Sequence, residues 1–114
     1  MGLDANAYKI EAKHAERKVD FPIPDNVFYA DFMDWRKHHD LQRWMEKLYR
    51  AKGGERADFN CTNVQIEDED LDELKRAMIS DEWNEYRIAD DAKFIVEARE
   101  AIENGFAVYY YCWW

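Results

Sequence analysis

Residues 106–114, FAVYYYCWW, constrain the fold more than any other stretch of the chain. Successive side chains of an extended strand point to opposite faces of a sheet. Every second residue from 106 to 114 would therefore share one face, and the other face would carry Ala107, Tyr109, Tyr111 and Trp113. Because both faces are apolar or aromatic, the strand must be covered on both sides, or one side must face a ligand. This pattern predicts a strand in the centre of a sheet.

The spacing of the apolar residues predicts the strands and helices of the N-terminal half. Residues 5–12 alternate weakly and predict a first strand, and Pro22 and Pro24 break the following segment into a loop. Residues 26–37 are compatible with a strand or a helix. An apolar stripe with helical spacing follows, and it predicts a helix capped by Asp40 and ended by Gly53-Gly54. The stripe consists of Leu41, Trp44, Met45 and Leu48.

The C-terminal half predicts a short strand and two further helices. The strand ends at Ile66, and the next helix has acidic residues 67–70 in its first turn, where the helix dipole favours negative charge. A last helix is expected to start at Asp90 or Asp91 and to end at Asn104-Gly105. Strands and helices are thus mixed, so we expect one α+β domain over residues 1–114. It would have a small, mostly antiparallel sheet of three to four strands, about three packed helices, and a central C-terminal strand.

Charge is unevenly distributed along the chain, whose formal net charge is -9. Residues 67–103 hold 14 acidic and 5 basic side chains, whereas the remainder holds 11 of each. Such a chain is not expected to bind duplex nucleic acid, which requires clustered Lys and Arg. The acidic segment could cover a positively charged partner protein, or it could serve only solubility.

Residues 34–39, DWRKHH, form the first candidate site, because they do not fit the apolar stripe that follows them. They would lead into a helix N-terminus, where unpaired N–H groups attract anions. Arg36, Lys37, His38 and His39 would lie just upstream of that helix, Arg43 would lie in its first turn, and Trp35 could stack on a flat ring. These residue types suit a nucleotide-like ligand. The alternative is a basic patch paired with the protein's own acids, with buried tryptophans.

The C-terminal aromatic residues form the second candidate site. Tyr109, Tyr111 and Trp113 share a strand face and could line a pocket, since Tyr and Trp combine stacking area with a polar atom. The alternative is a core strand, because aromatic residues favour strands.

Signals for catalysis, metal binding or cofactor binding are weak. The chain has no phosphate-binding glycine loop, no dinucleotide fingerprint, no HExxH and no GxSxG motif. We therefore predict no catalytic residues, metal ligands or cofactor, and a non-catalytic role is favoured over an enzymatic one. Cys61 and Cys112 are too few for a disulfide framework and are expected to be reduced. No apolar run is long enough for a membrane span and no export signal is evident, so we expect a cytoplasmic protein that does not bind membranes.

Four blocks along the chain together resemble a family of small proteins from tailed phages and prophages. The blocks are MGLD, DWRKHHDLQRWMEKLYRAKGG, FNCTNVQI before EDLDELKRAM, and DDAKFIVEAREAIENGFAVYYYCWW. Residues 15–31 do not take part in the match. Members are often labelled phosphoglycerate kinase, but this chain is far too small for that two-domain enzyme and lacks a nucleotide-kinase motif. The resemblance implies a phage accessory protein in the cytoplasm of an infected bacterial host, directed at that host.

Three functional hypotheses follow from the sequence. The leading one is a non-catalytic protein that binds a small anionic, nucleotide-like ligand between residues 36–39 and the C-terminal aromatics, and so sequesters a host immune signal. The second is an acidic inhibitor that covers a host or defence protein with residues 67–103. The weakest is a small nucleotide-processing enzyme that uses His38 or His39 as acid or base. The sequence leaves a homo-oligomer open.

Overall fold

The computed structural model describes residues 2–114. Four strands and three helices follow one another, with short 3₁₀ turns at Ala12–His14 and Glu85–Arg87. Their order along the chain is β1 (Asp4–Glu11), β2 (Tyr29–Arg36), α1 (His39–Ala51), β3 (Thr62–Ile66), α2 (Asp68–Met78), α3 (Ile88–Glu103) and β4 (Phe106–Trp113). The ambiguous segment before α1 is therefore a strand.

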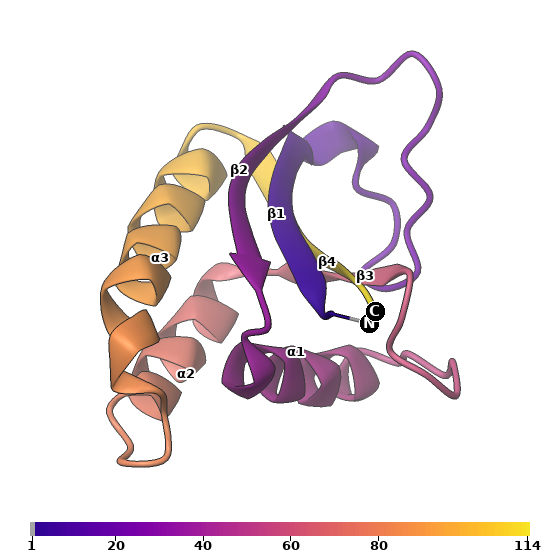
Figure 1. The fold of residues 1–114 in the computed structure, drawn as a ribbon. Coiled ribbons are helices and arrows are strands. Elements are labelled where there is room, and N and C mark those ends of the chain that lie inside the picture. The colour runs from indigo at the N-terminus through magenta and orange to yellow at the C-terminus, as the bar shows by residue number, and fades with distance from the viewer. Residues whose placement is uncertain (1) are drawn as a thin grey trace.

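The strands form one antiparallel sheet in the order β2-β1-β4-β3. The predicted α+β class and the central position of the C-terminal strand are confirmed, because β4 lies between β1 and β3. All three helices lie on one side of the sheet, and the long connection between β1 and β2 passes along the other side (Figure 1). We call these the helix face and the loop face.

The helix face carries the larger core. Alternate residues of the central strands, such as Ala7, Val108 and Tyr110, pack there against the helices. In α1 the predicted stripe is largely confirmed, since Leu41 and Met45 are fully buried. Tyr49 continues the same stripe one turn later and is also fully buried.

Two helix starts differ from those predicted. The N-cap of α1 is His38 and not Asp40, because the His38 side chain accepts a hydrogen bond from the Leu41 N–H. The last helix, α3, begins at Ile88, before the predicted Asp90 or Asp91. The Asn84 side chain caps the preceding 3₁₀ turn, and that turn runs into α3 with helical backbone angles at the junction. A cap at Asp90 or Asp91 is therefore not needed.

The loop face carries a smaller core beneath the β1–β2 connection. Phe21, from that connection, packs on Tyr8, Ile10, Ala107 and Tyr109 of the two central strands. The connection covers only part of this face. Tyr111 is half-buried and Trp113 is 42% exposed. The connection therefore covers the first half of β4 and leaves its C-terminal end open. This uncovered end of the loop face is where a ligand can reach the sheet.

Candidate functional site

Trp35 and His38, from the first predicted site, are buried on the helix face around the carboxylate of Asp91. Trp35 Nε1 donates to Asp91 Oδ1 at 3.1 Å, and Trp83 Nε1 donates to Oδ2 at 2.9 Å. His38 Nε2 lies 2.7 Å from the same Oδ2. Asp91 has no exposed surface, and His38 is 3% exposed. A buried carboxylate needs several donors, and these three supply them.

The same histidine occupies the helix N-terminus at which an anion was expected. The Leu41 N–H donates to His38 Nδ1 at 3.4 Å, so Nδ1 carries no proton and Nε2 is the nitrogen that donates to Asp91. Neither His38 nor Asp91 lines any of the surface cavities described below. We therefore assign this histidine–aspartate pair a structural role.

The basic members of the first site are dispersed over the surface. Arg36 Nε pairs with Asp4 Oδ1 at 3.3 Å, and Arg43 pairs with Asp40 in the first turn of α1. Lys37 and His39 are exposed, and Lys37 has a left-handed backbone with φ 55°. The structure does not bring this basic group together with Tyr109, Tyr111 and Trp113 around one cavity. Arg43 does border a cavity of about 190 Å³, but Asp40 and Glu82 border it too.

The C-terminal aromatic residues divide into a core residue and two cavity residues. Tyr109 is fully buried, because the Phe21 ring stacks on it with 4.9 Å between centroids and Tyr8 stacks at 5.4 Å. Its hydroxyl donates to the carbonyl of Arg17 at 2.6 Å. Tyr111 and Trp113 lie beyond the covering loop and line a cavity of about 400 Å³. That volume is within the range of small-ligand pockets.

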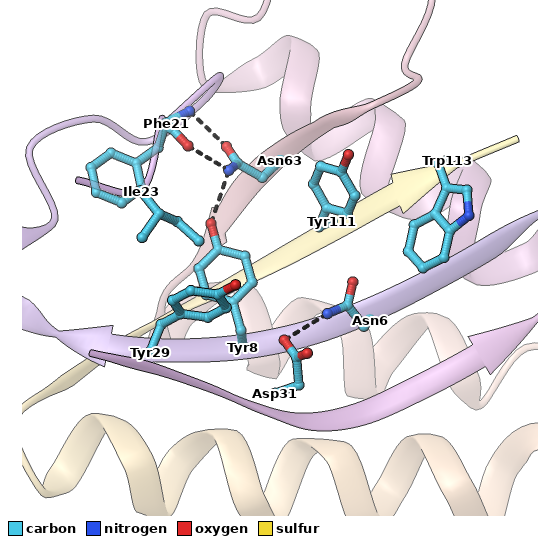
Figure 2. Close-up of a pocket in the computed structure, with 9 residues that line it drawn as sticks. All are labelled: Asn6, Tyr8, Phe21, Ile23, Tyr29, Asp31, Asn63, Tyr111 and Trp113. Carbon is cyan, nitrogen blue, oxygen red and sulfur yellow. Dashed lines mark hydrogen bonds between the residues drawn. The ribbon is translucent and has the colours of Figure 1, made fainter. Parts of the chain in front are cut away.

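This cavity, which we call the loop-face cavity, is built from all four strands and the β1–β2 connection. Figure 2 shows its lining side chains, which come from both central strands, from β2 and β3, and from the loop. They are Asn6, Tyr8, Phe21, Ile23, Tyr29, Asp31, Asn63, Tyr111 and Trp113. Aromatic rings dominate this set, and the polar members are two amides and one carboxylate.

Asn63 of β3 fixes one wall of the loop-face cavity. Its side-chain oxygen accepts from the Phe21 N–H at 2.7 Å, and its nitrogen donates to the Phe21 carbonyl at 2.7 Å. The same nitrogen donates to the Tyr8 hydroxyl at 2.9 Å. Asn63 is 5% exposed, so these bonds are shielded from water. They hold the loop and a tyrosine ring in one arrangement before any ligand arrives.

The floor of the cavity carries unused hydrogen-bond acceptors. Asn6 Nδ2 donates to Asp31 Oδ1 at 2.7 Å, while Asn6 Oδ1 is buried and has no partner within residues 2–114. Figure 2 shows the Asn6 nitrogen turned toward Asp31 and its oxygen turned away from it. Burial is the main cause that raises the pKa of Tyr8 above its ordinary value, and the nearby Tyr109 raises it further. The Tyr8 hydroxyl therefore stays protonated at neutral pH.

Sequence reasoning found Tyr111 and Trp113 of this cavity but missed its other residues. One signal for two of them was available, since Asn6 and Tyr8 fall on the same face of the predicted first strand. Asp31 is placed beside them by a register shift between β1 and β2 at Ala7/Tyr8. No local pattern predicts such a bulge.

Of the two free cysteines, Cys112 is buried and Cys61 is exposed. Burial raises the pKa of the Cys112 thiol to about 11, so this cysteine stays protonated and unreactive. Cys61 is exposed, and its N–H donates to the Cys112 carbonyl at 2.9 Å, so the two cysteines are neighbours without a disulfide. Within this part of the chain, no three His, Cys, Asp or Glu side chains group together to hold a metal ion. No helix in it has the length and apolar character to cross a membrane.

The acidic segment 67–103 is partly neutralised within the chain. Asp68 and Asp72 of α2 both pair with Arg99 of α3. Lys52 pairs with Glu67 at 2.9 Å and also with Asp70, which is 8% exposed and completes the capping box of α2. Asp70 is therefore a structural group rather than part of a free acidic surface.

Comparisons with protein-family models, with curated proteins and with solved structures found no match to this chain. The loop-face cavity is thus supported by its own geometry. It combines a wall held by Asn63, several aromatic rings and one unsatisfied buried acceptor in one place.

Proposed function

We propose that the protein is a non-catalytic binding protein that holds a small molecule in the loop-face cavity. The observation that carries this proposal is the pairing of stacking rings with a buried acceptor that no group of residues 2–114 satisfies. An unsatisfied buried acceptor costs about 1–3 kcal/mol, and a ligand that donates to it would recover that cost. Mostly aromatic walls with a few polar groups are typical of small-ligand sites.

The ligand class suggested by the sequence was nucleotide-like. The rings of Tyr111 and Trp113 suit the stacking of a flat base. The phosphate would have to be bound elsewhere, because the basic residues 36–39 do not line the cavity and Asp31 does. Nucleotides therefore belong in the test panel as one class among several.

The resemblance to phage proteins supplies a biological setting for this proposal. A cytoplasmic phage protein that binds a small signal without converting it would lower the free concentration of that signal, and so blunt a host defence. Sequestration requires tight binding and no turnover, and the lack of catalytic motifs in the sequence is compatible with it.

Mass spectrometry of small molecules released from purified protein tests the proposal, followed by calorimetry with each compound found. Trp113→Ala should weaken binding, because it removes one wall of the cavity at a half-exposed position where folding is little affected. Tyr86→Ala is the matched control, since Tyr86 is 85% exposed and lies outside the cavity. Equal affinity of both variants and the wild type would refute this cavity as the binding site.

A second candidate function is inhibition of a partner protein through the segment 67–103. One observation favours it: an apolar cavity of about 380 Å³ lies between α2 and α3, bordered by Ile79 and Val96, which are 77% and 64% exposed. The charged residues that border this cavity are Lys75 and Arg99, and its exposed apolar side chains suit an amphipathic segment of a partner. Val96→Glu should abolish capture of such a partner, whereas Phe28→Glu, at a residue 74% exposed outside this cavity, should not.

A further inference from the structure

The charges around the loop-face cavity are negative. Asp31 lines it, and no Lys, Arg or His of residues 2–114 does. Asp34 of β2 is the register partner of Asn6, so its side chain lies on the same face of the sheet as those of Asn6 and Asp31. Arg36, a cation of the same strand, is paired with Asp4. An anionic ligand would meet the Asp31 carboxylate here, with Asp34 on the same face of the sheet, whereas a cationic ligand would be attracted.

Two side chains at the floor of the cavity, Asn6 and Asp31, each keep a free acceptor atom. Asn6 Oδ1 has no partner, and only Oδ1 of Asp31 is used by Asn6 Nδ2. The amide cannot be turned over to change this, because its oxygen would then face the Asp31 carboxylate. A ligand that binds these two atoms must bring N–H or O–H donors. Trp113 lines the same cavity and is 42% exposed, so a change of its rotamer would not disturb the core.

Two aromatic pairs lie on either side of these acceptors. Tyr111 and Trp113 lie 5.7 Å apart between centroids and are inclined by 39°, and Tyr8 and Tyr29 meet edge to face at 5.7 Å. Figure 2 shows Asn6 and Asp31 lying between these two aromatic pairs. The face of an aromatic ring attracts cations, and a planar cation can also stack on it.

From these three observations we propose that the loop-face cavity recognises a guanidinium group. Its N–H donors match the Asp31 carboxylate and the Asn6 oxygen, its positive charge matches the acidic rim, and its flat faces match the rings of Tyr111 and Trp113. A quaternary ammonium group would satisfy the charge but not the acceptors. A neutral urea of the same shape would satisfy the acceptors but not the charge. This inference rests on the proposed small-molecule site and specifies its ligand.

Calorimetry with four simple probes tests the inference on the wild-type protein. 1-Butylguanidine carries the cation and the donors, butylurea has the same shape without charge, butyltrimethylammonium has charge without N–H groups, and AMP represents the anions. We expect butylguanidine to bind about tenfold or more tightly than each of the other three, as one charged hydrogen bond is worth at least that much.

A pair of variants assigns the effect to the cavity. Asp31→Asn keeps the shape of an exposed side chain and removes its charge, so it should reduce butylguanidine affinity about tenfold and reduce butylurea affinity much less, because butylurea loses only a neutral hydrogen bond. Asp90→Asn changes the net charge equally from an exposed position on α3, so it should change neither. Circular dichroism checks that both variants keep the wild-type fold.

The outcomes separate this inference from the function on which it rests. If butylurea or AMP binds as well as butylguanidine and Trp113→Ala weakens that binding, the cavity is a ligand site but the guanidinium preference is wrong. If no probe and no co-purified compound depends on Trp113, both proposals fail. An acetylated Gly-Arg-Gly amide distinguishes the source of the group: binding tighter than that of butylguanidine supports an arginine side chain, and weaker binding supports a free guanidino compound.

Discussion

Removal of the Asp91 carboxylate should destabilise the fold more than any other single change around α1 and α3. Asp91→Ala leaves three buried donors without a partner: Trp35 Nε1, Trp83 Nε1 and His38 Nε2. Each unsatisfied buried donor costs about 1–3 kcal/mol, offset in part because the buried charge is also removed. We expect a net loss of about 4 kcal/mol in the free energy of unfolding, within the range measured when one partner of a buried pair is deleted.

Two milder substitutions should give graded losses. Trp83→Phe removes one donor and leaves Asp91 with two, so it should cost roughly 1.5–3 kcal/mol. Asp91→Asn keeps one acceptor oxygen but turns an NH₂ group toward a donor. If the oxygen takes the Oδ2 position, His38 and Trp83 remain bonded and Trp35 is left facing the NH₂ group. The loss in the free energy of unfolding for Asp91→Asn should lie between the losses for Trp83→Phe and Asp91→Ala.

Urea unfolding followed by far-ultraviolet circular dichroism measures these differences. With a slope of about 2 kcal/mol per M, Asp91→Ala should lower the midpoint by about 2 M. Asp90→Ala is the matched control, because it removes an equal charge from the same turn of α3 at an exposed position. A cost below about 1 kcal/mol for Asp91→Ala, or equal costs for the two alanine variants, would refute the structural role assigned to this carboxylate.

Three further changes follow from contacts elsewhere. Gly54→Ala should cost about 2 kcal/mol by chemical denaturation, because its Cβ would lie 2.3 Å from the Tyr49 ring. Asn63→Ala should cost about 3 kcal/mol and increase hydrogen exchange at the Phe21 amide, since it removes both bonds to that residue. Stability should fall as pH rises above about 10, because burial raises the folded-state pKa of Tyr8, Tyr109 and Tyr110 while the unfolded chain releases their protons at the ordinary pKa. Chemical denaturation should therefore give a lower free energy of unfolding at pH 11 than at pH 9.

The helices and strands could be predicted from the sequence because each type of element gives its apolar residues a characteristic spacing. Leu41 and Met45 have helical spacing and are fully buried in α1, and the alternation after Gly105 gives a central strand. The α1 cap was misplaced for a related reason. Asp40 is the better cap by residue preference, but the tertiary position of His38 overrides that preference.

Long-range partners explain why the first predicted site looked functional. Trp35 and His38 fit no helical stripe, and without a partner they suggested a ligand-binding surface. Their partner is Asp91, which is more than 50 residues later in the chain and was expected to cap a helix. A single sequence holds no signal that relates these positions. A polar residue that breaks a pattern therefore indicates only that it needs a partner, inside or outside the chain.

The extent of the β1–β2 connection decides which aromatics of β4 are core and which can meet a ligand. Alternation places Tyr109, Tyr111 and Trp113 on one face and treats them as equivalent. The two hydrogen bonds from Asn63 to the Phe21 backbone fix where the loop crosses the sheet, and Phe21 then covers Tyr109 and stops short of Trp113. The boundary between core and cavity is thus set by one amide on β3. Because the same amide also holds Tyr8, loss of Asn63 should weaken ligand binding as well as stability, whereas loss of Asp91 on the helix face should weaken stability alone.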